Sequence, residues 1–210
     1  MPKVSDDYKE RKKASLYESA LKCFGEKGYQ STTIDDITAH SQTSKGLFYT
    51  YFKSKEELYI SLMDERTNHT LSRLNESFKT ISSAKEKVHE LFSLYKKASL
   101  TEEWRNFIRV QIEFWVHSPR LERARDVVTS RYEDLYTGMI SRIIEDGKAA
   151  GEFKQEIHAD VVANLFWAFI DGICMHYSVV GENYAYEAHF KATEEMIMNY
   201  ILIQPEKQKA

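Results

Sequence analysis

The sequence predicts an all-α protein, and three observations support this fold class. None of the 3 prolines lies between residues 3 and 118, and a long proline-free run rich in Glu, Lys, Leu and Ala favours helix. Helix-capping patterns recur along the chain. No segment alternates polar and apolar residues between turn signals, so we expect no strand.

Three helices are expected in the first 52 residues. An apolar stripe at helical spacing marks the first one: Tyr17, Ala20, Leu21 and Phe24. Gly28 is placed to end this helix, and Thr32 to cap a short second one. Residues 41–44 have the composition of a turn, and a third short helix is expected around Lys45 to Tyr51.

The remaining helices follow from their start and stop signals. Starts are indicated at Ser54, Ser83, Thr101 and Ser118. Gly147 and Gly151 bracket one expected stop, and Gly181 marks another. The most apolar helix is expected from about Asp160 to Val180, and the last from Tyr186 to Ile203. A tail over residues 205–210 should be frayed.

The composition is that of a globular protein, with 42% hydrophobic and 29% charged residues. The apolar stretch from Val161 to Met175 contains Asn164 and Asp171 and is shorter than the roughly 20 residues that span a bilayer. No charged-then-apolar leader opens the sequence, and the two cysteines have no metal-ligand spacing. We therefore expect a reduced cytoplasmic protein without a membrane partner.

The charge is unevenly distributed along the chain. Residues 1–55 carry ten bases and seven acids, whereas the remainder carries 19 bases and 25 acids. A basic segment on an acidic body indicates one end that meets a polyanion, although an imbalance of this size also suits a solvated face. The expected domains are residues 1–55 and residues 56–204.

The first three helices have the pattern of a helix-turn-helix unit. Ile34, Ile37, Phe48 and Phe52 can supply its apolar contacts. The third helix can present small or polar side chains to base edges: Ser44, Lys45, Gly46 and Thr50. Donors beside helix ends are candidates for phosphate contacts: Thr33, Tyr49 and Lys55.

Leu16 to Leu58 resemble the DNA-binding domain of the TetR family of bacterial transcriptional regulators. The matching residues are Ala20, Phe24, Gly28, Tyr29, Thr32, Thr33, Ile34, Ile37, Ser44, Lys45, Gly46, Phe48, Tyr49, Tyr51, Phe52, Ser54, Lys55, Glu56, Glu57 and Leu58. This resemblance implies phosphate contacts by Thr33 and Tyr49 and a DNA-backbone contact by Lys55. It also implies base contacts by Ser44, Lys45, Gly46 and Leu47, with Thr50 and Tyr51 at the groove edge.

The sequence departs from the family pattern around the turn. Gln42 and Thr43 stand where the family usually has glycine and an apolar residue, and Thr38 stands where it usually has alanine. A left-handed Gln42 would cost about 1 kcal/mol relative to glycine.

An aromatic stripe in the body has two interpretations. Such a stripe is more often core than a ligand site, but it includes an amide, Gln111, which needs partners when buried. The family's body binds an effector, so the resemblance implies a pocket for a small lipophilic or aromatic molecule. The candidates are Trp104, Phe107, Ile108, Gln111, Trp115, Trp167 and His176. His176 could instead be a hydrogen-bonded core histidine.

The helix from Asp160 to Val180 is apolar nearly all round, which indicates burial on two sides. A second subunit can cover one side, and the resemblance implies a four-helix dimer interface with the last helix. The candidates are Phe166, Phe169, Ile170, Gly172, Ile173, Ile197, Tyr200 and Ile201.

The sequence predicts a homodimer that binds a palindromic DNA operator, represses transcription and is released by an effector. No catalytic triad order, metal-ligand cluster or glycine-rich phosphate loop is present, so neither an enzyme nor a cofactor is expected. Two alternatives stay open. One is a helical small-molecule-binding or enzyme-like protein with a DNA-inactive first domain, and the other is an effector-independent nucleoid-associated protein.

Overall fold

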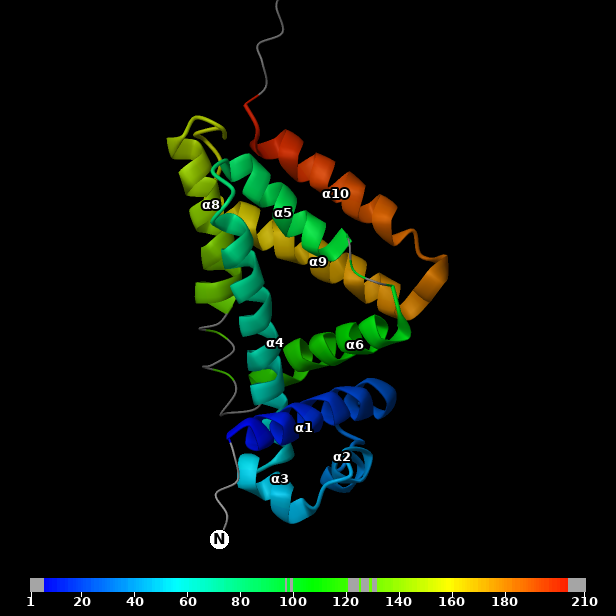
Figure 1. Cartoon of the computed structure of the whole chain (residues 1–210). Coiled ribbons are helices and arrows are strands. Elements are labelled where there is room, and N and C mark those ends of the chain that lie inside the picture. The colour runs from blue at the N-terminus through cyan, green and yellow to red at the C-terminus, as the bar shows by residue number, and fades with distance from the viewer. Residues whose placement is uncertain are drawn as a thin grey trace, which may run out of the picture. The chain divides into compact units, whose positions relative to one another are not determined.

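The computed structural model describes residues 6–96, 98, 100–120, 125, 129 and 132–203. Within these residues every regular element is helical (Figure 1). One isolated antiparallel bridge among them pairs Phe153 with Leu202. The all-α class is therefore confirmed, and the predicted tail at 205–210 lies outside the described residues. The α-helices are α1 (Asp6–Lys27), α2 (Ile34–His40), α3 (Lys45–Tyr51), α4 (Lys55–Phe78), α5 (Ala84–Lys96), α6 (Glu102–His117), α8 (Gly138–Ala149), α9 (Ala159–Val180) and α10 (Tyr186–Ile201).

Three shorter elements complete the description. They are the 3₁₀ turns η1 (Ser118–Arg120) and η3 (Gly181–Asn183) and the π-helix η2 (Tyr132–Thr137). The start signal at Ser118 therefore coincides with a 3₁₀ turn. The helix end expected between Gly147 and Gly151 is confirmed, because α8 ends at Ala149, and Gly151 has a φ of 73°. A side chain at Gly147 would collide with the ring of Phe153, so this glycine serves packing.

The chain forms two compact units whose limits differ from the expected boundary at residue 55. Unit 1 consists of Met1–Leu71 and Thr101–His117, and unit 2 of Ser72–Leu100 and Ser118–Ala210. Helix α6 therefore belongs with the first three helices, although the sequence pattern had indicated a place in the body.

Unit 1 is built around α1, which packs most extensively on α6 and then on α2. Phe24, Ile37 and Phe48 form its core and are almost completely buried. Helices α1 and α6 cross closely, because a side chain at Gly25 would lie 2.6 Å from Cβ of Asn106. The hydroxyl of Tyr59 on α4 donates a buried hydrogen bond of 2.7 Å to the carbonyl of Val110 on α6.

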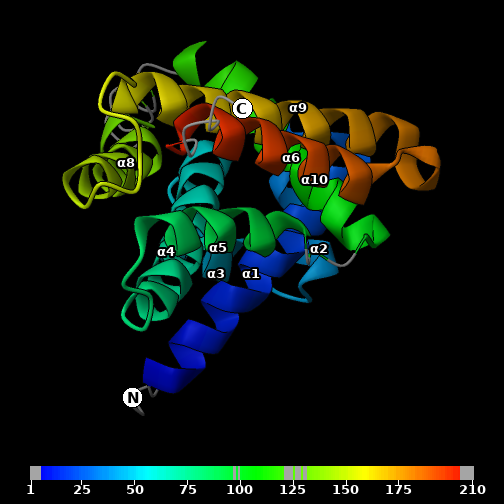
Figure 2. The ribbon, with the colours of Figure 1, turned by 90° about the horizontal axis from the view of Figure 1, so that it is seen from above.

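In the described part of unit 2, four helices form a closed order of contacts: α5 packs on α8, α8 on α9, α9 on α10, and α10 on α5 (Figures 1 and 2). Its core is aromatic, and Phe92, Phe166 and Phe190 are fully buried. The rings of Phe92 and Phe166 meet edge to face with centroids 4.9 Å apart, so α5 and α9 are joined by a specific aromatic contact.

The segment Ala159–Asn183 is long and apolar enough, by length and composition, to cross a membrane, and 44% of its most apolar window is buried inside the protein. The sequence prediction differed because it considered a shorter stretch. The core helix of a soluble protein meets the same criterion, and α9 packs on both α8 and α10.

Candidate nucleic-acid interface

The cap of α2 is Thr33, one residue later than expected. Its hydroxyl accepts a hydrogen bond from the backbone N–H of Asp36 at 3.1 Å, and the Asp36 carboxylate accepts from the backbone N–H of Thr33 at 2.8 Å. Thr32 instead turns inward, and its hydroxyl bonds to the carbonyls of Cys23 and Gly28. Thr33 is exposed, but its hydroxyl already serves the helix.

The turn between α2 and α3 accommodates its unusual residues with local hydrogen bonds. Gln42 adopts the left-handed conformation with a φ of 51°, as considered from the sequence. The hydroxyl of Thr43 lies 2.8 Å from that of Ser41, and the Thr38 hydroxyl donates to the carbonyl of Ile34 at 2.9 Å. The hydroxyl groups of Thr38, Ser41 and Thr43 therefore all have hydrogen-bond partners. The turn forms although it lacks the apolar residue that the family usually has.

Helix α3 presents one face to solvent and buries the other. Ser44 caps it, accepting from the N–H of Leu47 at 3.1 Å. Phe48 and Phe52 are buried and fix the helix on unit 1, with ring centroids 5.8 Å apart. The outward residues are Ser44, Lys45, Gly46, Tyr49 and Thr50, with Leu47 and Tyr51 partly exposed.

Two of these outward side chains, Tyr49 and Lys45, are long and end in a polar group. The Tyr49 side chain is 56% exposed, and its ring is held edge to face against Phe48. The Lys45 ammonium pairs with Asp35 at 2.7 Å, and both side chains are largely exposed. Such a surface pair is weak and exchanges readily, so Lys45 can leave Asp35 for an acceptor on DNA.

The structure contradicts the expected DNA contact of Lys55. Its ammonium donates to the carbonyl of Tyr29 at 2.6 Å, of Gln30 at 3.3 Å and of Thr32 at 2.7 Å. It also lies 4.4 Å from the centroid of the Tyr29 ring. All three donors of the ammonium point to the chain's own loop, so Lys55 anchors the segment before α2 rather than a phosphate.

Glu113 on α6 is a supporting residue that no sequence pattern indicated. Its carboxylate accepts a hydrogen bond of 2.9 Å from the backbone N–H of Tyr29. Burial, together with the negative charges of Glu56 and Glu113, raises the pKa of Tyr29 to about 12. Lys55 and Glu113 therefore hold the same loop from two helices. A contact across 84 residues leaves no local signal in the sequence.

The predicted effector residues divide between the two units. Ile108 is buried in unit 1 and thus acts as core, while the other α6 candidates, Trp104, Phe107, Gln111 and Trp115, are partly exposed. Trp104 stacks on Phe107 with centroids 5.3 Å apart. Arg66 lies over the Phe107 ring.

Trp167 and His176 lie on different faces of α9 in unit 2. Trp167 is buried, and its indole N–H donates to the carbonyl of Tyr136 at 3.0 Å. His176 is exposed and stacks near Tyr184 with centroids 6.0 Å apart. The interpretation of His176 as a core histidine is therefore wrong, because the ring is exposed.

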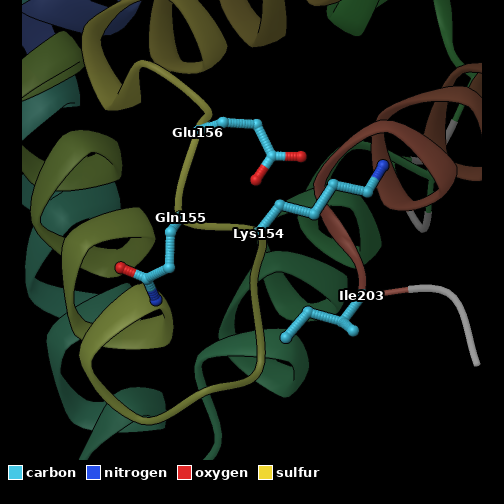
Figure 3. A pocket seen from close by; sticks show the side chains of 4 residues that line it. All are labelled: Lys154, Gln155, Glu156 and Ile203. Atoms are coloured by element: carbon cyan, nitrogen blue, oxygen red, sulfur yellow. The ribbon is translucent and has the colours of Figure 1, made fainter.

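A surface hollow of ≈ 600 Å³ in unit 2 is lined by Lys154, Gln155, Glu156 and Ile203 (Figure 3). The Lys154 ammonium donates to the carbonyls of Asn199 and Tyr200 at the end of α10. None of the predicted effector residues lines this hollow, and its lysine already caps a helix, so it does not fit the expected aromatic site.

The predicted dimer residues require a correction. Five of them are buried in the core of unit 2 and have no free surface for a second copy: Phe166, Ile170, Ile173, Ile197 and Ile201. Phe169 and Gly172 are partly exposed and Tyr200 is exposed. Opposite the buried stripe, an apolar exposed face runs along both helices: Val161, Leu165, Met175 and Val179 on α9, and Met196, Tyr200 and Ile203 at α10.

Comparison with known proteins gives two family matches. Residues 16–62 match the model for bacterial regulatory proteins of the tetR family, and residues 92–186 match the tetracyclin repressor-like C-terminal domain. The HTH-type transcriptional regulator YfiR of Bacillus subtilis is 29% identical over 210 residues, covering 98% of this chain and 99% of YfiR.

Solved structures share the fold. A transcriptional regulator from Saccharomonospora viridis in complex with choline has a TM-score of 0.79 at 22% identity, covering 93% of this chain and 100% of that one. The regulator FadR from Bacillus subtilis in complex with stearoyl-CoA has a TM-score of 0.73 at 22% identity, covering 88% of this chain and 97% of that one.

Proposed function

The chain belongs to the TetR family of helix-turn-helix transcriptional regulators, and on this premise we propose that it represses transcription as a homodimer on a palindromic operator. The observation that carries the proposal is the outward face of α3, where Lys45, Tyr49 and Thr50 are exposed while Phe48 fixes the helix from behind. A short helix presented in this way fits the major groove. The family members compared above are regulators rather than enzymes, and we place the protein in the cytoplasm, with its DNA.

Within this proposal, the base contacts come from Ser44, Lys45, Gly46 and Leu47, and the groove-edge contacts from Thr50 and Tyr51. Tyr49 is the phosphate ligand with the freest side chain, and the backbone around Thr33 lies at the start of α2, where an anion is favoured. Lys55 is withdrawn from this set.

The dimer is proposed to form through the exposed apolar face of α9 and α10. Val179 is 77% exposed and Met196 is 58% exposed, values that are unfavourable for large apolar side chains left in water. A Cβ added at Gly172 would meet no atom within 4 Å, so packing within one chain does not require a glycine there. A close helix crossing in the dimer would require one. Two α3 helices related by a twofold axis would then enter successive major grooves about 34–36 Å apart.

Release is proposed to depend on a small effector bound by the helical body. The S. viridis and B. subtilis relatives were crystallised with choline and stearoyl-CoA, so this fold accommodates small ligands of different chemistry. An effector that binds more tightly to a conformation unable to match both grooves lowers DNA affinity by a population shift.

Fluorescence anisotropy with duplexes recovered from random-sequence DNA tests the DNA interface. Tyr49→Phe should weaken binding to all duplexes by a similar factor, because it removes a contact to phosphate, and phosphates carry no sequence information. Lys45→Ala should change the order of preference among duplexes. Lys85→Ala, an exposed lysine on α5, is the matched control and should change neither.

Affinity should fall steeply with rising salt, as expected when phosphate contacts release counterions. No duplex binding at low salt would contradict the proposal and favour a helical ligand-binding protein whose first domain is DNA-inactive. Duplex binding that no effector releases would favour a nucleoid-associated role.

A further inference from the structure

Asp35 on α2 is an exposed acid beside the lysine that is proposed to contact bases. Its Oδ1 atom lies 2.7 Å from Nζ of Lys45 at the start of α3, and the two side chains are 68% and 56% exposed. Within the described part of the chain, the other carboxylate oxygen, Oδ2, has no protein partner. The two side chains together therefore present a cationic donor and an anionic acceptor to the outside.

The next residue, Asp36, has a different role. Its carboxylate accepts a hydrogen bond of 2.8 Å from the backbone N–H of Thr33 and pairs with Lys27 of α1. Its side chain is only 26% exposed. Since Asp36 already completes the cap of α2, the cap does not require Asp35. The first turn of α2 thus contains one acid that serves the fold and one that is directed outwards.

The surface around Asp35 and Lys45 has little positive charge. Between Thr33 and Phe52 the sequence contains one lysine, no arginine and two acids. Attraction to DNA phosphates grows with the number of positive charges that neutralise them, and the charge of Lys45 is already balanced by Asp35. A neutral donor–acceptor pair gains little from a phosphate, whereas base edges in the major groove offer partners to both of its members.

A G·C base pair presents the complementary groups. In the major groove, guanine O6 is an acceptor and the cytosine N4 amino group is a donor. These two atoms share an N–H···O hydrogen bond and so lie about 2.9–3.0 Å apart, which is close to the 2.7 Å between Lys45 Nζ and Asp35 Oδ1. An ammonium has three donors. Lys45 can therefore donate to guanine and keep Asp35, while Asp35 accepts the outer N4 hydrogen.

An A·T base pair matches these side chains less well. Its donor, adenine N6, is flanked by the acceptor N7, which would face the carboxylate of Asp35. Its acceptor, thymine O4, is flanked by a methyl group, which would crowd the ammonium of Lys45. At a G·C pair, guanine N7 instead gives Lys45 a second acceptor. The two side chains therefore favour G·C over A·T.

We propose that Asp35 and Lys45 together read one G·C base pair in each half-site, with Asp35 as a specificity-determining residue. Lys45 donates to guanine, and Asp35 accepts from the N4 amino group of the paired cytosine. This inference rests on the DNA-binding function proposed above, and it adds a residue of α2 to the base contacts of α3.

The test uses the full-length protein and a duplex selected from random-sequence DNA, with affinity measured by fluorescence anisotropy. The base pair in question is the one at which Lys45→Ala loses its preference. N4-methylcytosine at this pair in both half-sites keeps the Watson–Crick hydrogen and removes the outer one. The wild type should bind the methylated duplex about fivefold or more weakly than the unmethylated duplex. Asp35→Ala should bind the two duplexes equally.

Glu18→Ala removes an exposed acid of α1 in the same unit and is the matched control for loss of charge. It should keep the wild-type response to methylation. The inference is overturned, with the repressor function left standing, by a wild type that binds both duplexes equally. The same holds if Asp35→Ala still discriminates between them, or if Lys45→Ala changes no base preference. A wild type that binds no duplex at low salt would overturn both proposals.

Discussion

Lys55 shows how one residue type in one sequence position can have two roles. The sequence places it at a helix start beside the expected DNA surface, where a lysine is well placed for a phosphate. In the structure its ammonium is instead surrounded by three carbonyls of the 29–32 loop. Burial accordingly lowers the pKa of Lys55, since the charged form has lost water.

We predict that Lys55→Met lowers the free energy of unfolding by about 1–3 kcal/mol, because it removes hydrogen bonds to partly buried carbonyl groups. Chemical denaturation measures this loss. Lys53→Met is the control, since Lys53 is exposed and lies outside this cluster. Unchanged stability combined with weaker DNA binding would restore Lys55 to the interface.

Asp171 gives a prediction for pH dependence. Its folded-state pKa of about 6 exceeds the usual 3.8, so the folded protein retains the proton more tightly than the unfolded chain. Ionisation of Asp171 therefore lowers the stability of the folded state. The loss has its full size above about pH 7 and disappears as the pH falls towards about 4. The tyrosine and cysteine side chains around it in the described residues, including Tyr95 and Cys174, are neutral throughout this range.

Asp171→Asn should thus raise the thermal midpoint at pH 8, with an advantage that shrinks steadily as the pH is lowered. Asp160→Asn should show no such trend. A constant difference between Asp171→Asn and wild type across the pH range would place the carboxylate in open water.

Several features at the residue scale were predictable because they depend on near neighbours. The left-handed Gln42 and the exposed face of α3 follow from turn position and helical periodicity. The partners of Lys55 and Glu113 do not, because they lie 23 to 84 residues away in sequence.

Helix α6 is the element whose place differed most from expectation. Its limits follow from a capping signal and apolar spacing, and the structure has it at Glu102–His117. Periodicity identifies an apolar stripe but not the surface that covers it. That surface is α1, and the close crossing depends on Gly25 beside Asn106.

We predict that Gly25→Ala destabilises the protein by about 1–3 kcal/mol, because the added methyl overpacks the crossing of α1 and α6. Thermal unfolding measures the change. Gly46→Ala is the matched control, since its Cβ would make an ordinary van der Waals contact, 3.7 Å from the Ser44 hydroxyl oxygen, and should not lower stability. Equal stability of Gly25→Ala and wild type would mean that this crossing is loose.

Helix α9 shows a related limit. The sequence predicted its length and its two-sided burial, but a helix that is apolar all round does not reveal which stripe faces its own core. The chain's own packing takes the stripe of Phe166, Ile170 and Ile173. The remaining stripe of Leu165 and Val179 is the one left for a second molecule.

At the scale of the whole molecule, Leu165→Arg should convert the dimer to a monomer without unfolding it. Leu165 is 42% exposed, so the arginine charge can stay in water in a single chain. Burying the same charge in an apolar dimer interface is unfavourable. Light scattering coupled to size exclusion measures the mass. Val116→Arg, at a 53% exposed position on α6, is the control and should remain dimeric. A wild-type protein that is monomeric at all concentrations would contradict the proposed assembly.

In the proposed assembly, two copies of α3 read one duplex across a twofold axis. Selection of bound fragments from random-sequence DNA by the full-length protein tests it most directly, because the consensus reports symmetry and spacing together. We predict an inverted repeat with half-site centres one helical turn, about 34–36 Å, apart or at a multiple of that distance. A single asymmetric site, or no enrichment over unselected DNA, would contradict it.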